Sequence, residues 1–200
     1  RPQTASVIVG LDNYEFQDRQ WLRRRSTAVQ KPVNIYELHF GSWRKKAEKE
    51  DGWYSYEELG ELLIPYLKEN GYNYVELLPL SEHPSDESWG YQNTGFFAPT
   101  SRYGTPDGLR AFVDQCHQNG VGVIMDFVPV HFAVDDYALW NYDGTALYEH
   151  PDPRRGEQPQ WGTMLFNLER SEVQSFLISN AVFFLKEYHI DALRVDAVSC

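Results

Sequence analysis

Two charged residues near the end of the chain have the types and the spacing of a catalytic pair. Arg194 and Asp196 lie in the stretch 190–198, whose other side chains are mostly apolar. This pattern predicts a short buried strand, and residues two apart on a strand point to the same side. A guanidinium beside a carboxylate at the carboxyl end of a strand would keep the carboxylate ionised, as a nucleophile requires. A purely structural ion pair is the competing interpretation, because such pairs are common.

A carboxylate and an imidazole follow another apolar run. Asp126 stands near the end of the stretch 121–127, and His131 follows five residues later, past Pro129. Both groups could hydrogen-bond the hydroxyls of a sugar. His131 taken alone could equally be a satisfied loop histidine, but a buried strand that ends in an unpaired carboxylate needs an explanation.

Aromatic residues supply a third feature. They make up 15% of the chain, and between residues 89 and 104 they alternate with glycines and polar groups. A flat amphipathic ring such as that of Tyr91 suits a ligand with an apolar face and a polar rim, which describes a carbohydrate. A rigid, turn-rich loop accounts for the same residues, and on this segment alone it is the simpler interpretation.

Composition and charge narrow the classes of function. The 200 residues suffice for one domain with a large core, and the net charge of −11 argues against nucleic acid or an acidic membrane surface as partner. Cys116 and Cys200 give neither a disulfide framework nor a metal-ligand spacing, so we expect no metal and no cofactor. No apolar run is long enough to span a membrane and no secretory segment is evident, which predicts a cytoplasmic enzyme.

The elements that would position these residues alternate along the chain. Apolar and β-branched runs predict strands at 33–40, 74–79, 121–127 and 190–198, and helical spacing predicts helices from 55 to about 70, at 106–118 and at 171–188. Ser55 and Glu58 form a capping-box signal, and Pro65 predicts a kink or an earlier break in the first of these helices. Long loops follow the second and third strands, at 81–105 and 129–170.

The resulting order, βαβαβαβ, implies a parallel sheet. Long loops after the strands favour a (β/α)8 TIM barrel, whose active site is built at the carboxyl ends of the strands. An open doubly wound sheet fits the count equally well, but no glycine-rich phosphate loop follows the first strand, so a dinucleotide fold is disfavoured. Because a complete barrel has eight strands, we predict that residues 32–200 are its N-terminal half, truncated after strand 4. Residues 1–31 show no sustained periodicity and are predicted to be a connector.

Several segments together resemble a known family. The stretches 126–131 and 191–196 are similar to the first and second conserved segments of the α-amylase superfamily. The stretches 37–43, 143–154 and 161–167 narrow the resemblance to the 1,4-α-glucan (glycogen) branching enzymes. The resemblance extends from about residue 32 to the end, and the segment at 11–14 is similar to this family's exit from an N-terminal β-sandwich domain.

The resemblance implies a role for each candidate residue. Asp196 would be the nucleophile that forms a glycosyl-enzyme intermediate, and Arg194 would keep it ionised and oriented. Asp126 and His131 would bind the sugar at the cleavage point, and Tyr91 would stack beneath its ring. The implied reaction cleaves an α-1,4-glucan with retention of configuration and passes the segment to a 6-hydroxyl, making α-1,6 branches in glycogen.

The resemblance also implies a second carboxyl group, the general acid, on a fifth strand beyond Cys200. Glu37, Glu76 and Glu82 match no acid motif, so the isolated 200 residues are expected to be inactive. An α-glucan hydrolase of the same superfamily is the first alternative, in which water intercepts the intermediate. A non-catalytic amylase-like binding domain is less favoured, because Asp196 and the other candidate site residues are all present.

Overall fold

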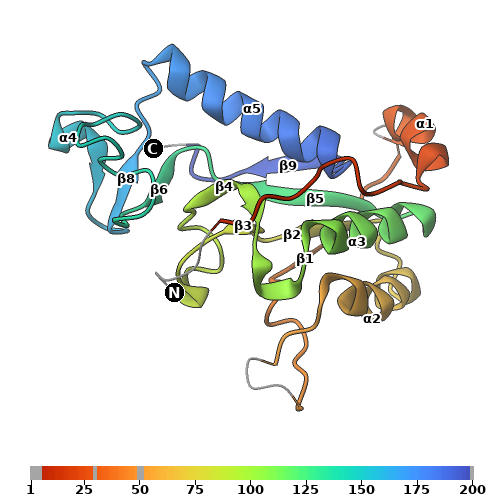
Figure 1. Ribbon diagram of the computed structural model, residues 1–200. Helices are drawn as coiled ribbons and strands as arrows, with labels where there is room; N and C mark the ends of the chain where they lie inside the picture. The colour runs from red at the N-terminus through yellow and green to blue at the C-terminus, as the bar shows by residue number, and fades with distance from the viewer. Residues whose placement is uncertain (1–5, 29–30, 49–51, 199–200) are drawn as a thin grey trace.

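Four parallel strands form the central sheet of the protein, whose computed structural model describes residues 6–28, 31–48 and 52–198 (Figure 1). Their order across the sheet is β1-β2-β5-β9, and each neighbouring pair runs parallel. The strands are β1 (Ile35–Leu38), β2 (Tyr74–Leu77), β5 (Gly122–Phe127) and β9 (Ala192–Val195). The predicted strands are therefore confirmed in order and direction, and each is shorter than its apolar run.

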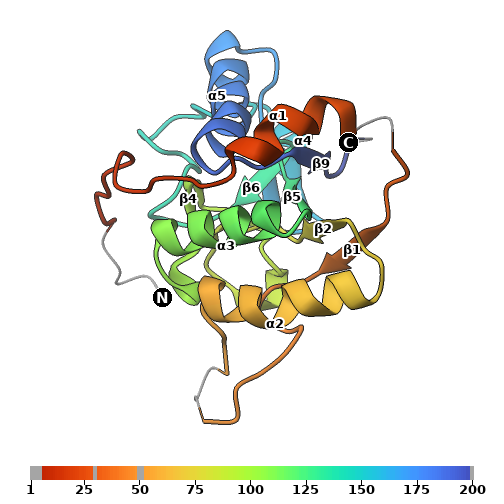
Figure 2. The same cartoon turned by 90° about the vertical axis from the view of Figure 1, so that its right-hand side faces the viewer.

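Three helices connect these strands. They are α2 (Tyr56–Glu69), α3 (Pro106–Gln118) and α5 (Ser171–Glu187). In Figure 2, α2 and α3 lie side by side along one side of the sheet, and α5 lies above it. A parallel sheet whose crossover helices cover one side is the arrangement of the first four units of a (β/α)8 barrel, which confirms the predicted fold class.

The first of these helices begins and ends close to the predicted positions and continues through Pro65. The Ser55 side chain accepts from the backbone N–H of Glu58, and the Glu58 side chain accepts from the backbone N–H of Ser55, which completes the capping box. The helix nevertheless runs through Pro65 to Glu69, so the predicted earlier break is wrong. Pro65 and Glu61, whose carbonyl loses its helical partner, are both exposed, so water can hydrogen-bond that carbonyl.

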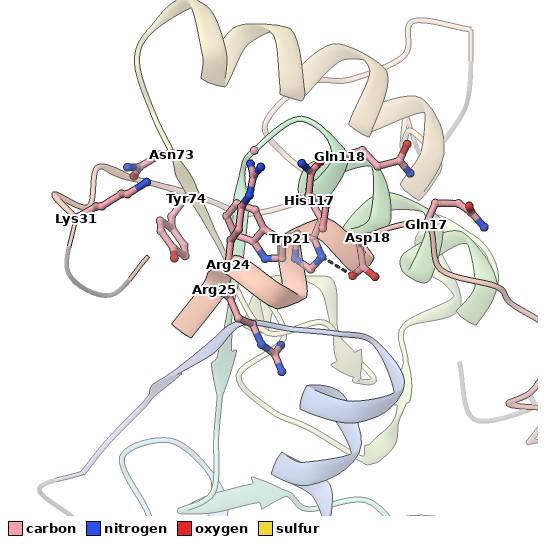
Figure 3. Close-up of a pocket in the computed structure, with 12 residues that line it drawn as sticks. Gln17, Asp18, Trp21, Arg24, Arg25, Lys31, Asn73, Tyr74, His117 and Gln118 are labelled. Atoms are coloured by element: carbon pink, nitrogen blue, oxygen red, sulfur yellow. Dashed lines mark hydrogen bonds and ion pairs between the residues drawn. The ribbon is translucent and has the colours of Figure 1, made fainter. Parts of the chain in front are cut away.

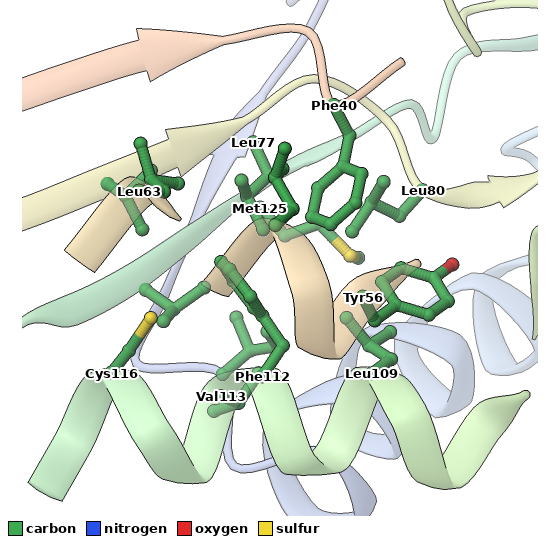
Figure 4. Packing of buried hydrophobic residues seen from close by; sticks show 14 of the residues in the cluster. Phe40, Tyr56, Leu63, Leu77, Leu80, Leu109, Phe112, Val113, Cys116 and Met125 are labelled. Carbon is green, nitrogen blue, oxygen red and sulfur yellow. The ribbon is translucent and has the colours of Figure 1, made fainter. Parts of the chain in front are cut away.

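The main hydrophobic core lies between the sheet and these helices (Figure 4). Side chains from β2 and β5, such as Leu77 and Met125, face the helices, and Leu109 and Phe112 of α3 pack against them. Cys116 is buried in the same cluster, and burial raises the pKa of its thiol. Cys200 lies outside the described residues.

The two long loops contain short elements that the sequence analysis did not predict. The first holds the antiparallel pair β3 (Ser81–Glu82) and β4 (Gly95–Pro99), with the single turns η1 (Asp86–Ser88) and η2 (Ser101–Tyr103). The second holds α4 (Pro153–Gly156) and a three-stranded antiparallel sheet of β6 (His131–Ala133), β8 (Thr163–Leu165) and β7 (Glu157–Gln158). A second apolar cluster packs beneath this sheet and joins it to β4 and α5; it comprises Phe96, Phe132, Met164, Phe166, Val173 and Leu177.

The segment before β1 also folds onto the sheet. It contains α1 (Arg19–Ala28), a helix that the sequence analysis did not predict. Trp21 on this helix donates its indole N–H to Asp191 Oδ1 at 2.8 Å, and its ring stacks on His117 at a centroid distance of 5.1 Å. Asp18, just before the helix, is buried and contacts His117 Nδ1 at 2.8 Å. These contacts dock the segment at the amino-terminal ends of β5 and β9.

The strand predicted to be buried at 190–198 differs from the expectation. β9 spans four residues and pairs with β5 alone among the described residues, so it is an edge strand. Ala192, Arg194 and Val195 are exposed, and Val195 is 44% exposed. An edge strand lacks a neighbour on one side, which explains why its apolar residues are accessible here.

Candidate active site

The charged residues at the carboxyl ends of β5 and β9 meet as neighbours. Asp126 and Arg194 are direct partners in the parallel register of these strands. Asp196 follows one residue after β9 ends, and its backbone N–H donates to the carbonyl of Phe127 at 2.9 Å. The sheet therefore carries Asp126, Arg194 and Asp196 to one rim, as the alternation of strand residues predicted.

Arg194 links the two carboxylates. Its Nη1 lies 2.7 Å from Asp196 Oδ1 and 3.2 Å from Asp126 Oδ2. The residue Asp126 is only 3% exposed, while the Asp196 side chain is 23% exposed and open to a ligand. One guanidinium thus holds a buried and an accessible carboxylate in fixed relation, with charge-assisted hydrogen bonds to both.

Tyr91 supplies a further contact with the buried carboxylate. Its hydroxyl donates to Asp126 Oδ2 at 2.6 Å, which fixes the position of the phenol ring. Asp126 Oδ1 is buried and has no hydrogen-bond partner among the described residues. The Asp126 carboxylate is therefore paired, contrary to the unpaired group expected from the sequence, and one of its oxygens remains without a donor.

The environment changes the acidity of these groups. Burial raises the pKa of Asp126 above its usual range, although the Tyr91 hydrogen bond and the Arg194 charge favour its ionised form. Burial acts to lower the pKa of Arg194, but attraction to Asp126 and to Asp196 outweighs it and raises that pKa. Burial and the bond to Asp126 raise the pKa of Tyr91, so its hydroxyl stays protonated as a donor.

His131 occupies the first position of β6, beside this cluster. It is buried, and its Nδ1 has no hydrogen-bond partner among the described residues. Burial lowers the pKa of its imidazole, although the charge of Asp196 opposes that shift. A neutral ring at this position can donate from one nitrogen and accept at the other, which suits a sugar hydroxyl.

The loop that carries Tyr91 is held in a strained conformation. Trp89 has a φ of 54°, and Gly90 has a φ of 91°. A Cβ atom added at Gly90 would lie 2.2 Å from the carbonyl oxygen of Pro79, just beyond β2. Only glycine therefore fits between Trp89 and Tyr91, and this close approach sets where the Tyr91 ring points.

Glu76 and Glu82, two of the three glutamates that match no acid motif, have different surroundings. Burial, Asp126 and Glu37 together raise the pKa of Glu76, but its strand register places it opposite Ile124, one layer below the rim. Burial would raise the pKa of Glu82, but hydrogen bonds from Ser101 and His83 and the charge of Arg102 hold it below its usual value. Glu82 is thereby engaged in the loop between β3 and η2.

A contact near His131 was missed by sequence reasoning. The ring of Trp161 lies 4.9 Å from the His131 ring, centroid to centroid, and its carbonyl accepts from the Gln92 side chain at 3.0 Å. Trp161 belongs to a motif quoted from the sequence, but no spacing rule connects residue 161 to residue 131. Only the pairing of β6 with β8 brings them together.

One cavity among the described residues lies away from this cluster. It measures about 500 Å³ and is lined by residues of α1, by the end of α3 and by the residues that precede β2 and β5 (Figure 3). None of the five predicted site residues lines it. It lies at the amino-terminal ends of the strands, whereas the predicted site lies at their carboxyl ends, so we do not assign the chemistry to it.

The described residues contain neither a metal-binding cluster nor a membrane-spanning helix. Across 6–28, 31–48 and 52–198, no group of three or more His, Cys, Asp or Glu side chains could hold a metal ion. None of the helices in that part of the chain is long and apolar enough to cross a membrane.

Comparison with known proteins identifies the relatives of this chain. A family model described as the alpha amylase catalytic domain matches residues 61–142. The whole chain aligns with the 1,4-alpha-glucan branching enzyme of Oleidesulfovibrio alaskensis at 53% identity, and the alignment covers 32% of that enzyme. It is 56% identical over its full length to 27% of the corresponding enzyme of Nitrosomonas eutropha. Over residues 61–142 the chain is similar to α-amylase catalytic domains, and over its full length it is similar to branching enzymes. The resemblance to branching enzymes is confirmed, and the chain spans about a third or less of the length of these relatives.

Solved structures of the superfamily share the fold. A putative alpha amylase from Salmonella typhimurium superposes with a TM-score of 0.76 over 96% of this chain and 30% of that protein, at 26% identity. An Anoxybacillus α-amylase superposes with a TM-score of 0.71 and 22% identity. The superposition covers 83% of this chain and 41% of the amylase chain. The chain thus corresponds to less than half of each superfamily member, consistent with a partial barrel.

Proposed function

We propose that the protein to which this chain belongs is a 1,4-α-glucan branching enzyme. It cleaves an α-1,4-glucan with retention of configuration and transfers the released segment to a 6-hydroxyl of an acceptor chain. The observation that carries the proposal is the link from Arg194 to both Asp126 and Asp196 at the strand ends. It occurs in a chain that is 53–56% identical to relatives named as branching enzymes.

Asp196 is the nucleophile in this proposal. Arg194 holds its Oδ1 at 2.7 Å, so Oδ2 is the oxygen that we assign to the attack on the anomeric carbon. The bond from that carbon to the leaving glucan oxygen breaks as the new ester bond forms, and a general acid protonates the leaving oxygen. In the second step the acceptor 6-hydroxyl gives its proton to the same general acid, which was deprotonated in the first step, and its oxygen displaces Asp196 from the anomeric carbon, which restores the free carboxylate.

The neighbouring residues bind the sugar at the cleavage point. Asp126 Oδ2 is occupied by Tyr91 and Arg194, whereas the buried Oδ1 can accept from a sugar hydroxyl. His131, kept neutral by burial, can bind a second hydroxyl. The hydrogen bond from Tyr91 to Asp126 fixes the phenol ring, which we assign to stacking beneath the pyranose.

The partner and location belong to the same proposal. The substrate is a neutral α-1,4-glucan such as glycogen, which a protein with a net charge of −11 can bind without electrostatic cost. That charge disfavours nucleic acid and acidic membrane surfaces as partners. We place the enzyme in the cytoplasm, and we propose residues 1–31 as the connection from an upstream β-sandwich domain to the barrel half at 32–200.

The nucleophile can be tested by Asp196→Ala in the full-length protein. We expect branching to fall by about 10⁴-fold or more, the scale that follows loss of a nucleophile, while glucan binding remains. Iodine staining with chain-length analysis measures branching, and release of reducing ends measures hydrolysis. The exposed Glu69 provides a control, because Glu69→Ala removes a carboxylate at the end of α2, just before β2 begins and away from the carboxyl ends of the strands. Branching retained in Asp196→Ala contradicts the assignment of the nucleophile. If the unmutated protein releases reducing ends without making new branches, the hydrolase alternative is favoured.

A further inference from the structure

Trp161 is an aromatic residue that neither hydrophobic core uses. It is 39% exposed and belongs to neither the main cluster beneath the sheet nor the second cluster around Phe132 and Phe166. Part of the indole is therefore accessible to a ligand. Exposed single apolar residues are common, so the case for a role rests on what lies next to this one.

The backbone around Trp161 is nevertheless well fixed. The residue sits in the loop 159–162, which joins the antiparallel strands β7 and β8. Its N–H donates to the carbonyl of Gln158 at 3.2 Å, and its carbonyl accepts from Gln92 Nε2 at 3.0 Å. Gly162 follows with a φ of 65°, a left-handed conformation that glycine adopts readily. The backbone that carries the indole is thus held by its own hairpin and by the loop that carries Tyr91.

The contacts of Trp161 lead directly to the proposed sugar-binding residues. Its ring lies 4.9 Å from the ring of His131, with 48° between the planes. Gln92, which holds its carbonyl, is the residue after Tyr91. The indole therefore adjoins His131, and the backbone that carries it is tied to the Tyr91 loop. A pyranose has an apolar face and a polar rim, and an indole is a suitable surface for that face.

We propose that Trp161 forms a second glucosyl-binding position, next to the sugar held by Tyr91, Asp126 and His131. The proposal rests on the proposed function, because it takes an α-glucan as the ligand. The indole stacks on the glucosyl unit adjacent to the one at the cleavage point, and the ring of His131 lies between the two units. Trp161 is thus a substrate-binding residue that selects for chains rather than single sugars.

The proposal is tested by measuring binding without turnover. In the full-length protein carrying Asp196→Ala, maltoheptaose binding is measured by calorimetry with and without Trp161→Ala. We expect the Kd to rise about tenfold, equivalent to about 1.4 kcal/mol, and the affinity for glucose to change little. Trp161→Phe keeps a flat ring and should recover most of the affinity. Trp161→Leu keeps apolar bulk without a ring and should show the same tenfold rise in Kd. It therefore serves as the test if Trp161→Ala does not fold.

Trp140 is a matched control on a neighbouring loop. It is 37% exposed, close to the 39% of Trp161, and no ring contact joins it to His131 or Tyr91 among the described residues. Trp140→Ala should leave the Kd for maltoheptaose unchanged. An unchanged Kd in folded Trp161→Ala or Trp161→Leu overturns the proposal, as does an equal loss in Trp140→Ala. The Kd compares proteins that differ only at residue 161, whereas branching by Asp196→Ala is read in a separate assay, so failure of this proposal and failure of the proposed function are distinguishable.

Discussion

Gly90 provides a sharp test of how the Tyr91 loop positions the site. The residue has a φ of 91°, and an added Cβ would lie 2.2 Å from the Pro79 carbonyl oxygen and 3.1 Å from the carbonyl carbon. Nonbonded carbon atoms keep about 3.5–4.0 Å apart, so Gly90→Ala forces the loop away from Pro79 by about 1 Å or more. Because the obstacle is backbone rather than a flexible side chain, the Tyr91 loop must take up the movement.

The free-energy cost of Gly90→Ala has two parts, and a second glycine, Gly71, allows them to be measured separately. A left-handed conformation costs a residue other than glycine about 1–2 kcal/mol. Gly71, at the end of α2, has a φ of 76° and nothing within 4 Å of an added Cβ, so Gly71→Ala incurs this first part alone. Gly90→Ala adds displacement of Tyr91, whose 2.6 Å hydrogen bond to Asp126 would break. Loss of a hydrogen bond to a charged group costs about 1.5–3 kcal/mol, which brings the total to about 3–5 kcal/mol.

The assay compares both variants in the full-length protein. Thermal unfolding should show a small loss for Gly71→Ala and a larger one for Gly90→Ala. The branching kcat/KM should be unchanged in Gly71→Ala and fall by about 100-fold in Gly90→Ala, because a displacement near 1 Å has that effect on a preorganised site. If Gly90→Ala keeps the parental kcat/KM, the close contact with Pro79 does not position Tyr91.

Two further predictions concern Tyr91 and the start of α2. Tyr91→Phe removes a bond that favours the ionised form of Asp126, so the pKa of Asp126, already raised by burial, should rise further. The acidic limb of the pH profile of kcat/KM should then move to higher pH. Tyr148→Phe, which removes a hydroxyl away from the site, should leave that limb in place. An unmoved limb in Tyr91→Phe refutes the effect of the Tyr91 hydroxyl on the pKa of Asp126. Ser55→Ala removes the N-cap of α2 and should cost about 1 kcal/mol, seen as faster hydrogen exchange in the first turn of α2 with unchanged KM. Unchanged exchange there would show that the capping box with Glu58 adds no stability.

The parts of the fold that could be predicted from the sequence depend on local patterns. Helical spacing placed α3 and α5 within a residue or so of their ends, because their apolar faces repeat every three or four residues. Period-two alternation and chain order placed Asp126, Arg194 and Asp196 at one rim. The three residues meet because parallel strands end at the same edge of a sheet, and that rule needs no knowledge of the loops.

The parts that were missed depend on contacts between distant segments. Helix α1 contains few apolar residues, and its docking rests on bonds such as that from Trp21 to Asp191, which are 170 residues apart. Trp161 reaches His131 only through the pairing of β6 with β8. The sequence also left the effect of Pro65 on α2 between a kink and an earlier break, because whether a proline breaks a helix depends on which side faces water.

The exposed edge strand β9 is held at both of its ends by charged residues. At the amino end, Asp191 Oδ2 accepts from the backbone N–H of Val123 at 2.8 Å and contacts His117 Nε2 at 2.9 Å. At the carboxyl end, Arg194 bonds to Asp126, and the Asp196 amide bonds to β5. The catalytic and the structural interpretations of the Arg194 and Asp196 pair are therefore compatible. The contact that ties the strand to its neighbour is the same one that orients the proposed nucleophile.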